Sequence, residues 1–400
     1  MALLTYSTKP RGSVVHTLGL AEALARAGQR VTVWTLGRDG DRGFFRPVDP
    51  GVRQIVVPFP KVEGEGVGPR ILRSIGALRD AFEPERYDIV HAQDCISANA
   101  AGPCVRTVHH LDHFTTPELA ACHERAIVTP RAHICVSAAV AAELASGWGI
   151  QAVVIPNGVD AGRFAAAASD QPDAVERRRG WRSRFGRYVL AVGGIEPRKG
   201  TLDLVEAFAL ARRRLPDASL VMAGGETVFD YRGYRAAVEA RAAELGVHPV
   251  ILGPVDHDAL PSLVAAAGAF ALPSTKEGFG LAAMEALAAG VPLVMRDLPV
   301  LREVFGPAAW FSATAPEMAT ALVTALTCPD PTRREEGRRL AARHTWEAAA
   351  AAHIEVYRSL RERSRQPSAR IPTLVPSLAR HRTVDLPAQR AATSAREQKS

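Results

Sequence analysis

The chain of 400 residues is long enough for two domains of about 150 to 200 residues each. Hydrophobic residues make up 47% and charged residues 23%, which is typical of folded globular proteins and excludes a fully disordered chain or a fibrous repeat. No run of about 18 apolar residues occurs, so the sequence predicts no transmembrane helix. The N-terminal residues also lack the charged leader and long apolar block of a secretory signal.

The net charge of +7 is concentrated at the end of the chain. Residues 361–400 contain nine Lys or Arg and three Asp or Glu, a net +6, which leaves +1 for residues 1–360. The body of the chain is therefore electrically balanced, and we expect no nucleic-acid partner. The end is rich in Arg, Ser, Pro and Ala, so we predict a disordered basic tail over residues 365–400.

The five cysteines are scattered, and no two have the CxxC spacing of redox or zinc sites. Their number is odd, which argues against a disulfide framework. We therefore predict a reducing, cytoplasmic location for this chain. The residues are Cys95, Cys104, Cys122, Cys135 and Cys328.

Short apolar runs alternate with longer amphipathic segments, a pattern typical of βαβ units and a mainly parallel sheet. In the first half the predicted strands are residues 2–6, 31–36, 88–92, 105–108, 132–136 and 152–155. The predicted helical segments there are 14–27 and 71–82. Residues 162–187, an alanine run followed by an arginine cluster, are predicted to connect two domains.

A second alternating series follows this connection. Its predicted strands are residues 188–192, 220–223, 250–252, 270–272 and 292–295, and its predicted helical segments are 202–213, 231–245 and about 280–289. Residues 260–267 form a further segment of the series. Two α/β halves of similar size predict a cleft between them. Parallel sheets bind ligands at the carboxyl ends of their strands, so we expect the site there.

The strongest chemical pattern lies between Pro273 and Pro292. A strand ends at Leu272, a glycine-bearing loop follows, and a helix is expected to begin near Gly280. The first backbone N–H groups of a helix lack intrahelical acceptors and form a ready site for a phosphate. Glu277 lies just before this helix and Glu285 about one and a half turns inside it. Their carboxylates can accept hydrogen bonds from vicinal sugar hydroxyls.

These two acids, with seven residues between them, resemble the E-x7-E signature of retaining glycosyltransferases with the GT-B fold, of the family 4, group 1 type. Further segments resemble the same family in the same order, over roughly residues 1–362. They are residues 88–92, 107–109, 155–160, 192–200, 252–255 and 345–347. The resemblance implies two Rossmann-like, doubly wound α/β domains that face each other across the cleft.

The expected domain limits follow from this resemblance and from the composition. Residues 1–165 would form an acceptor-side domain, 166–187 the connection, and 188–345 the nucleotide-sugar domain. Residues 346–364 would form a terminal helix that crosses back to the first domain, ahead of the tail.

The resemblance also implies roles for individual residues. Lys199 and Arg198 would neutralise the diphosphate of a UDP- or GDP-sugar, which fits the general value of a fixed cation beside a departing phosphate. Glu277 would hold the donor sugar and phosphate, together with the backbone amides of a short segment. Glu285 would bind the ribose hydroxyls. The remaining donor-binding candidates are Val255, which would meet the base, and Phe279, Gly280 and Leu281, which supply those amides.

The resemblance places His109 near the anomeric carbon of the donor sugar. His110 and His113 follow it, but a metal site is not expected, because GT-B transferases position phosphates with protein groups. His16 could approach the acceptor, although a histidine on a helix face is more often structural. The sequence offers no convincing nucleophile, so we expect a retaining, front-face mechanism in which the leaving phosphate takes the acceptor proton.

Two glycine positions depart from the family pattern. The first loop keeps only Gly12 of the usual glycine pair, and Gly194 stands where many relatives have an arginine. Gly12 can still permit close approach of the backbone to a ligand. These departures keep two alternatives open, a subunit that binds nucleotide-sugar without transferring it and a nucleotide-sugar epimerase. A dehydrogenase is not favoured, since no strand is followed by GxGxxG and a later acid.

A peripheral membrane contact is a further expectation. Residues 69–82 place three arginines, Arg70, Arg73 and Arg79, among Ile, Leu and Ala, as in helices that lie on anionic membranes. A helix that simply covers the sheet is the alternative.

Overall fold

The computed structural model describes residues 1–112, 114, 116–224 and 231–365. Residues 1–357 form one compact unit. The predicted basic tail, residues 365–400, lies outside the described residues except for its first residue. Within the described residues, no helix combines the length and the apolar character that a membrane span requires.

The first sheet is entirely parallel, with strand order β3-β2-β1-β4-β5-β6-β7. The order reverses at β1, so β1 and β4 start the two wings of a doubly wound sheet. Its strands are β1 (Ala2–Leu4), β2 (Val31–Arg38), β3 (Val52–Phe59), β4 (Val90–Ala92), β5 (Val105–Val108), β6 (Ala132–Cys135) and β7 (Val153–Val154). The helices between them are α1 (Gly12–Arg26), α2 (Val67–Ala81), η1 (Pro84–Arg86), α3 (Cys95–Ala101), α4 (Pro117–Val128) and α5 (Ala138–Trp148).

The second sheet is also parallel, with order β10-β9-β8-β11-β12-β13. Its strands are β8 (Arg187–Val192), β9 (Ala218–Ala223), β10 (Val250–Gly253), β11 (Ala269–Leu272), β12 (Leu293–Arg296) and β13 (Ala309–Ser312). The helices are α6 (Ala161–Ala167), α7 (Pro172–Phe185), η2 (Pro197–Lys199), α8 (Thr201–Arg212), α9 (Arg232–Glu244), α10 (Leu260–Ala266), α11 (Leu281–Ala288), α12 (Pro299–Phe305), η3 (Gly306–Ala308), α13 (Ala315–Thr327), α14 (Pro331–Arg343) and α15 (Trp346–Arg365).

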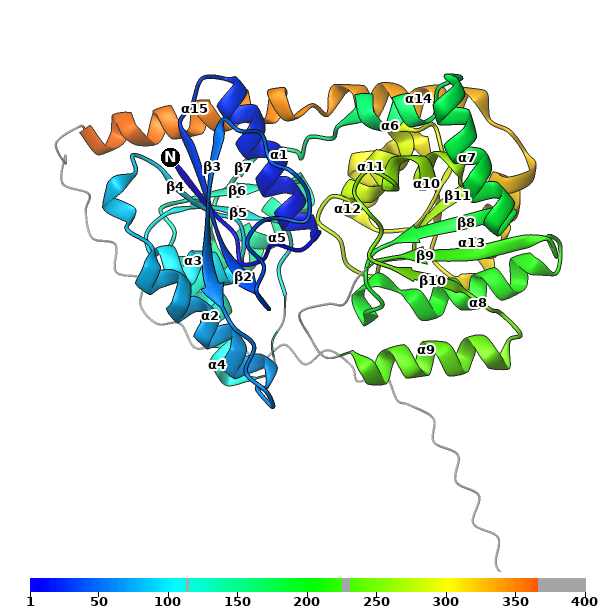
Figure 1. Cartoon of the computed structure of the whole chain (residues 1–400), viewed down its shortest axis with the longest axis horizontal. Coiled ribbons are helices and arrows are strands. Elements are labelled where there is room, and N and C mark those ends of the chain that lie inside the picture. Colours follow the sequence, from blue (N-terminus) through cyan, green and yellow to red (C-terminus); the bar gives the residue numbers. More distant parts are fainter. Residues whose placement is uncertain (113, 115, 225–230, 366–400) are drawn as a thin grey trace, which may run out of the picture. The chain divides into compact units, whose positions relative to one another are not determined.

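Helices cover both faces of the second sheet (Figure 1). One apolar core joins this sheet to α8, α9 and α13, and another joins it to α6, α10, α11, α12 and α14. Every buried strand here is a short apolar run, as expected for a parallel sheet that is covered on both sides. The two predicted doubly wound α/β halves are confirmed.

The predicted strands are confirmed to within two residues, but β3 and β13 were missed. β3 is the edge strand of the first sheet, so it tolerates Pro58, and only its two end residues, Val52 and Phe59, are buried. The predicted connection at 162–187 contains two helices, α6 and α7. Both pack against α10, so this segment lies on the second half of the molecule.

The beginning of α15 packs against the first half. Arg26 of α1 forms an ion pair of 2.7 Å with Glu347, and the Trp346 ring lies against Gly19. A Cβ atom at Gly19 would collide with that ring, so this glycine permits the close approach of α1 and α15. Gly158 makes a similarly close contact with the backbone of Trp346.

Candidate functional site

The two acids of the sequence pattern lie on either side of the start of α11. Glu277 is in the loop after β11, and Glu285 is in the second turn of the helix. Gly280 precedes the first helical residue, Leu281, and has a φ of 97°, a backbone conformation that favours glycine. The loop therefore turns into the helix at a glycine, and the first N–H groups of α11 lie beside Glu277 in the chain.

Glu277 is surrounded by hydrogen-bond donors. Lys199 Nζ lies 2.5 Å from its Oε1, and the Ser274 hydroxyl donates to the same oxygen over 2.9 Å. Arg198 lies 3.8 Å away and also forms an ion pair of 2.7 Å with Glu196. Burial alone would raise the pKa of Glu277, but the charges of Lys199 and Arg198 and these hydrogen bonds lower it to about 2. The structure thus brings Lys199, Arg198 and Glu277 together as a charged network.

Glu285 has a different environment. Burial raises its pKa to about 7, and the nearby positive charge of Arg163 opposes this rise only in part. Within the described part of the chain, no group donates a hydrogen bond to its carboxylate. Glu285 is therefore a partly buried acid to which no described group donates, and a hydroxyl-bearing ligand would supply a donor.

Arg163 connects Glu285 to the loop that holds Val255. The Arg163 guanidinium donates a hydrogen bond to the carbonyl of His257. Val255 itself lies two residues beyond β10 and packs, partly buried, against the core that contains α11. The Phe279 side chain is only 3% exposed and belongs to this core, so only its backbone remains available to a ligand.

His109 follows β5 and meets the Glu277 loop. A Cβ atom at Gly278 would collide with the His109 carbonyl oxygen, so only glycine permits this contact between the carboxyl edges of the two sheets. Burial, together with the positive charges of His110 and Arg106, lowers the pKa of His109 to about 3. The His109 ring is therefore neutral at ordinary pH.

Behind His109 lies a group of buried histidines that the sequence did not predict. The rings of His16 and His109 lie 4.8 Å apart, and those of His91 and His353 lie 5.6 Å apart. His91 bonds the Tyr357 hydroxyl at 2.7 Å and the Thr107 hydroxyl at 2.8 Å. Burial is the main reason why the pKa values of His16, His91 and His353 are lowered. His16 is thus part of a group of buried, neutral histidine rings, which we call the neutral wall.

The remaining predicted positions can also be located. Gly12 is the first residue of α1, and the space where its side chain would be is open. In α2, Arg73 forms a two-pronged ion pair with Glu65, so the arginines there are not all available to a membrane. The membrane contact remains a prediction. His113 lies outside the described residues, and among those described no cluster of three His, Cys, Asp or Glu is arranged to hold a metal.

Comparisons with known proteins identify the family of this chain. Residues 181–338 match the model of glycosyl transferases group 1, and residues 10–163 match that of glycosyltransferase family 4. A phosphatidyl-myo-inositol mannosyltransferase of Mycobacterium tuberculosis is 30% identical over 321 residues, which cover 74% of this chain and 76% of that protein. The chain belongs to the family 4, group 1 glycosyltransferases.

Other similar proteins support the same assignment. A D-inositol 3-phosphate glycosyltransferase of Jonesia denitrificans is 30% identical over 323 residues, which cover 72% of this chain and 75% of that protein. Among solved structures, the sucrose-phosphate synthase of Thermosynechococcus elongatus has a TM-score of 0.73 at 22% identity, over 90% of this chain and 98% of that one. Anabaena HepE in complex with UDP and glucose has a TM-score of 0.67 at 19% identity, over 90% and 99%. These structures establish the GT-B fold.

Sequence reasoning missed several residues at the site of this glycosyltransferase. Glu196 and Ser274 lie within three residues of a predicted position, but neither belongs to a pattern that signals a contact. Arg163 and Tyr357 reach the site from α6 and α15, far along the chain from their partners. Only the folded structure brings them there.

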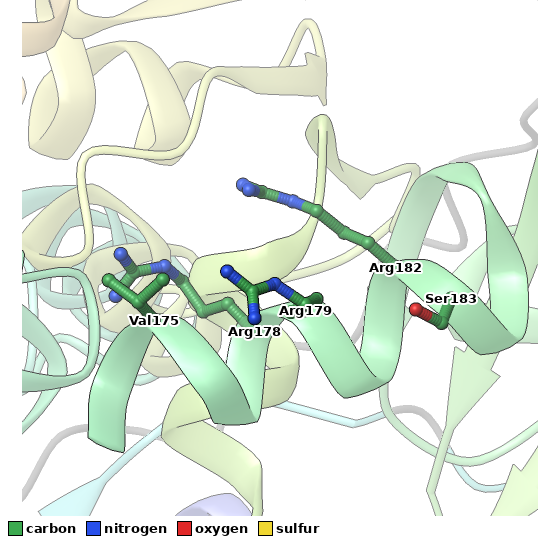
Figure 2. Close-up of a pocket in the computed structure, with 5 residues that line it drawn as sticks. All are labelled: Val175, Arg178, Arg179, Arg182 and Ser183. Atoms are coloured by element: carbon green, nitrogen blue, oxygen red, sulfur yellow. The ribbon is translucent and has the colours of Figure 1, made fainter. Parts of the chain in front are cut away.

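A separate hollow lies along α7, away from the predicted residues. It is lined by Val175, Arg178, Arg179, Arg182 and Ser183 (Figure 2). Arg178 donates to the carbonyls of Ala167 and Ser169, and Arg182 donates to that of Ala266. Two of these arginines therefore cap the C-terminal ends of α6 and α10, which gives them a structural role.

Proposed function

We propose that this glycosyltransferase moves a sugar from a UDP- or GDP-sugar to a hydroxyl acceptor, with retention at the anomeric carbon and without a metal ion. The observation that carries the proposal is the network of Lys199, Arg198 and Glu277 beside the start of α11. Two cations and free helix N–H groups at one point suit a diphosphate. The complex of Anabaena HepE with UDP and glucose is consistent with such a donor.

Each predicted residue has a role in this proposal. Lys199 and Arg198 neutralise the diphosphate, while Glu277 positions Lys199 and accepts hydrogen bonds from the donor sugar. Glu285 accepts hydrogen bonds from the ribose. Val255 contacts the base. The backbone groups of Gly12, Phe279, Gly280 and Leu281 contact the donor phosphates and sugar.

The proposed reaction breaks the bond between the anomeric carbon and the leaving phosphate oxygen on the same face at which the acceptor hydroxyl attacks. The acceptor oxygen forms the new bond, and its proton passes to the leaving phosphate. The protein supplies orientation and charge stabilisation. A neutral His109 suits this step, because an imidazolium would repel the positive charge that develops on the sugar.

Thermal denaturation with UDP, GDP, ADP and their sugars tests donor binding, because a ligand that binds only the folded state raises the melting temperature. We expect one nucleotide series to raise it and slow release of free sugar from the matching donor. Glu277→Ala should abolish that release. NMR of the product should show retained configuration, and activity should survive EDTA.

The alternatives predict other outcomes. A non-catalytic binding subunit would show the thermal shift without any release or transfer of sugar, and an epimerase would convert the donor without releasing nucleotide. The absence of a shift with every nucleotide, or a stable glycosyl adduct on the protein, would contradict the proposal.

A further inference from the structure

The His16 ring is buried beside His109, yet neither of its nitrogens has a hydrogen bond. His16 lies on α1 and is 1% exposed, and its Nδ1 and Nε2 atoms have no partner among the described residues. The Nε2 atom of His109 is buried in the same way, whereas its Nδ1 atom is not. A neutral imidazole has one N–H donor and one lone-pair acceptor, so nitrogens that need partners meet at this contact.

The two rings are close enough to become each other's partner. Their centres lie 4.8 Å apart and their planes are inclined at 77°, so a small ring rotation brings one nitrogen of each to hydrogen-bond distance. Rotation about the last side-chain bond costs little for an imidazole or an amide. Trp346 packs on the same His16 ring, with the ring centres 5.5 Å apart. The His16 ring is therefore packed against both His109 and the start of α15.

Two neighbours, Arg106 and His353, are placed so that they do not compete for this contact. Arg106 precedes Thr107 on β5, and the Thr107 hydroxyl bonds His91 of the neutral wall at 2.8 Å. Successive residues of a strand point to opposite faces, so Arg106 points away from the wall. His353 donates from Nδ1 to a carbonyl of its own helix at 2.7 Å. Its ring centre is 6.2 Å from that of His16, too far for a direct hydrogen bond.

Asn157 sets the direction of a bond between His16 and His109. It lies three residues beyond β7, beside the His16 ring, and its Oδ1 atom is buried without a partner. Burial and the neighbouring histidines lower the pKa of His16, whereas the contact with Asn157 raises it, as an acceptor that faces an imidazole N–H does. With its N–H directed to Asn157, His16 has only a lone pair left for His109. His109 must then donate from Nε2.

We propose that His16 is a positioning residue for His109: Asn157 and His16 hold His109 as the Nε2–H tautomer, which leaves the lone pair of its Nδ1 atom for the reacting sugar. This inference rests on the proposed function for the location of that sugar. A lone pair at this point can accept a hydrogen bond from a sugar hydroxyl. It also favours the positive charge that develops at the anomeric carbon, although the protein places no charged side chain there.

Heteronuclear NMR of the imidazole nitrogens tests the tautomer without any substrate, and His109→Gln assigns the signal. In the unmodified chain we expect His109 to be protonated at Nε2 and unprotonated at Nδ1. His16→Phe keeps a ring against Trp346 but removes both nitrogens, so the His109 signal should change to a mixture of the two tautomers. His16→Asn, which supplies a side-chain oxygen as acceptor, should recover the Nε2–H form and exclude misfolding as the cause.

Kinetics test the consequence for the reaction. His16 acts through His109 and does not contact the donor, so His16→Phe should lower kcat about tenfold and change the donor KM by less than about twofold. His133→Phe is the matched control. His133 is also a buried histidine, on β6, but it bonds the Ile127 carbonyl at 2.7 Å. This variant should lower the melting temperature and leave the His109 signal unchanged.

Three outcomes would overturn the proposal: an Nδ1–H tautomer of His109 in the unmodified chain, an unchanged Nε2–H signal in His16→Phe, or a changed tautomer with an unchanged kcat. The spectra require no donor, so the tautomer is measured even in a chain that transfers no sugar. An Nε2–H tautomer that depends on His16, in a chain that binds no nucleotide, would contradict the proposed function and leave the bond between the two histidines established.

Discussion

The carboxyl edges of the two sheets use charge in opposite ways. On the second sheet, the cations are already paired: Lys199 with Glu277, Arg198 with Glu196, and Arg296 with Asp203. On the first sheet, four histidines are held neutral by burial. The second edge thus has a fixed electrostatic framework, which suits the leaving group of the proposed reaction. The first presents a neutral wall of histidine rings.

Removing the acid at the centre of the paired network should have the largest effect. Glu277→Gln leaves Lys199 without its anionic partner and removes a charged acceptor from the donor site. We expect the kcat/KM for transfer to fall about 10²-fold to 10³-fold. Lys276→Gln, in the same loop as Glu277, removes a partly exposed ion pair with Glu143 of α5 and is the matched control. A loss of less than about threefold in Glu277→Gln would show that the paired network is not part of the reaction.

The contribution of the buried histidines of the neutral wall can be tested by measuring the free energy of unfolding. His91→Leu would leave the Tyr357 and Thr107 hydroxyls buried without their shared partner, and we expect it to lower the free energy of unfolding by about 2 to 4 kcal/mol. Tyr357→Phe removes one of the two bonds and should cost about 1 to 2 kcal/mol. Urea unfolding measures both. If His91→Leu cost no more than Tyr357→Phe, the bond to Thr107 would contribute nothing to the wall.

Glu285 differs from the rest of the second edge and should make donor binding depend on pH. Its pKa is raised to about 7, so the free protein holds this acid partly protonated at neutral pH. If ribose binds the carboxylate, loss of that proton accompanies binding, and affinity should rise about tenfold from pH 6 to pH 8. For stability the sign is the reverse: the native state binds more protons than the unfolded state between about 4.5 and 7, so stability falls as pH rises through that window.

Glu285→Gln provides the control for this pH effect. Nucleotide phosphates themselves titrate near pH 6, so the difference between the two proteins isolates the contribution of the acid. We expect the variant to show a smaller change in nucleotide affinity over the same range, measured by calorimetry. Identical pH profiles would mean that Glu285 does not bind the ribose as a carboxylate.

The same contrast explains what the sequence could predict. The second edge is built from residues in two short segments, around Lys199 and Glu277, where turn glycines and a helix start leave a local pattern. The first edge is built from contacts between distant residues, such as His91 and Tyr357, 266 positions apart. His16 is equally hard to recognise, since a histidine on a helix face is ordinary until His109 and Asn157 are placed beside it. The alternating pattern predicted both sheets but missed an edge strand of each, β3 and β13. In β3 the apolar run is followed by Pro58, a residue that argues against a central strand.

Substitutions of the α7 arginines test whether these charges have only a structural role. We expect their effect on stability to be the smallest of this series. Arg178 is 8% exposed and donates to two carbonyls at the end of α6, whereas Arg179 is exposed on the same hollow (Figure 2). Arg178→Ala leaves those carbonyls unsatisfied and should lower the free energy of unfolding by about 1 kcal/mol. Arg179→Ala should change it by less than about 0.5 kcal/mol. Neither variant should alter nucleotide affinity, because both arginines lie outside the network of Lys199 and Glu277. A weaker nucleotide affinity in Arg178→Ala with unchanged stability would mean that the hollow communicates with the donor site.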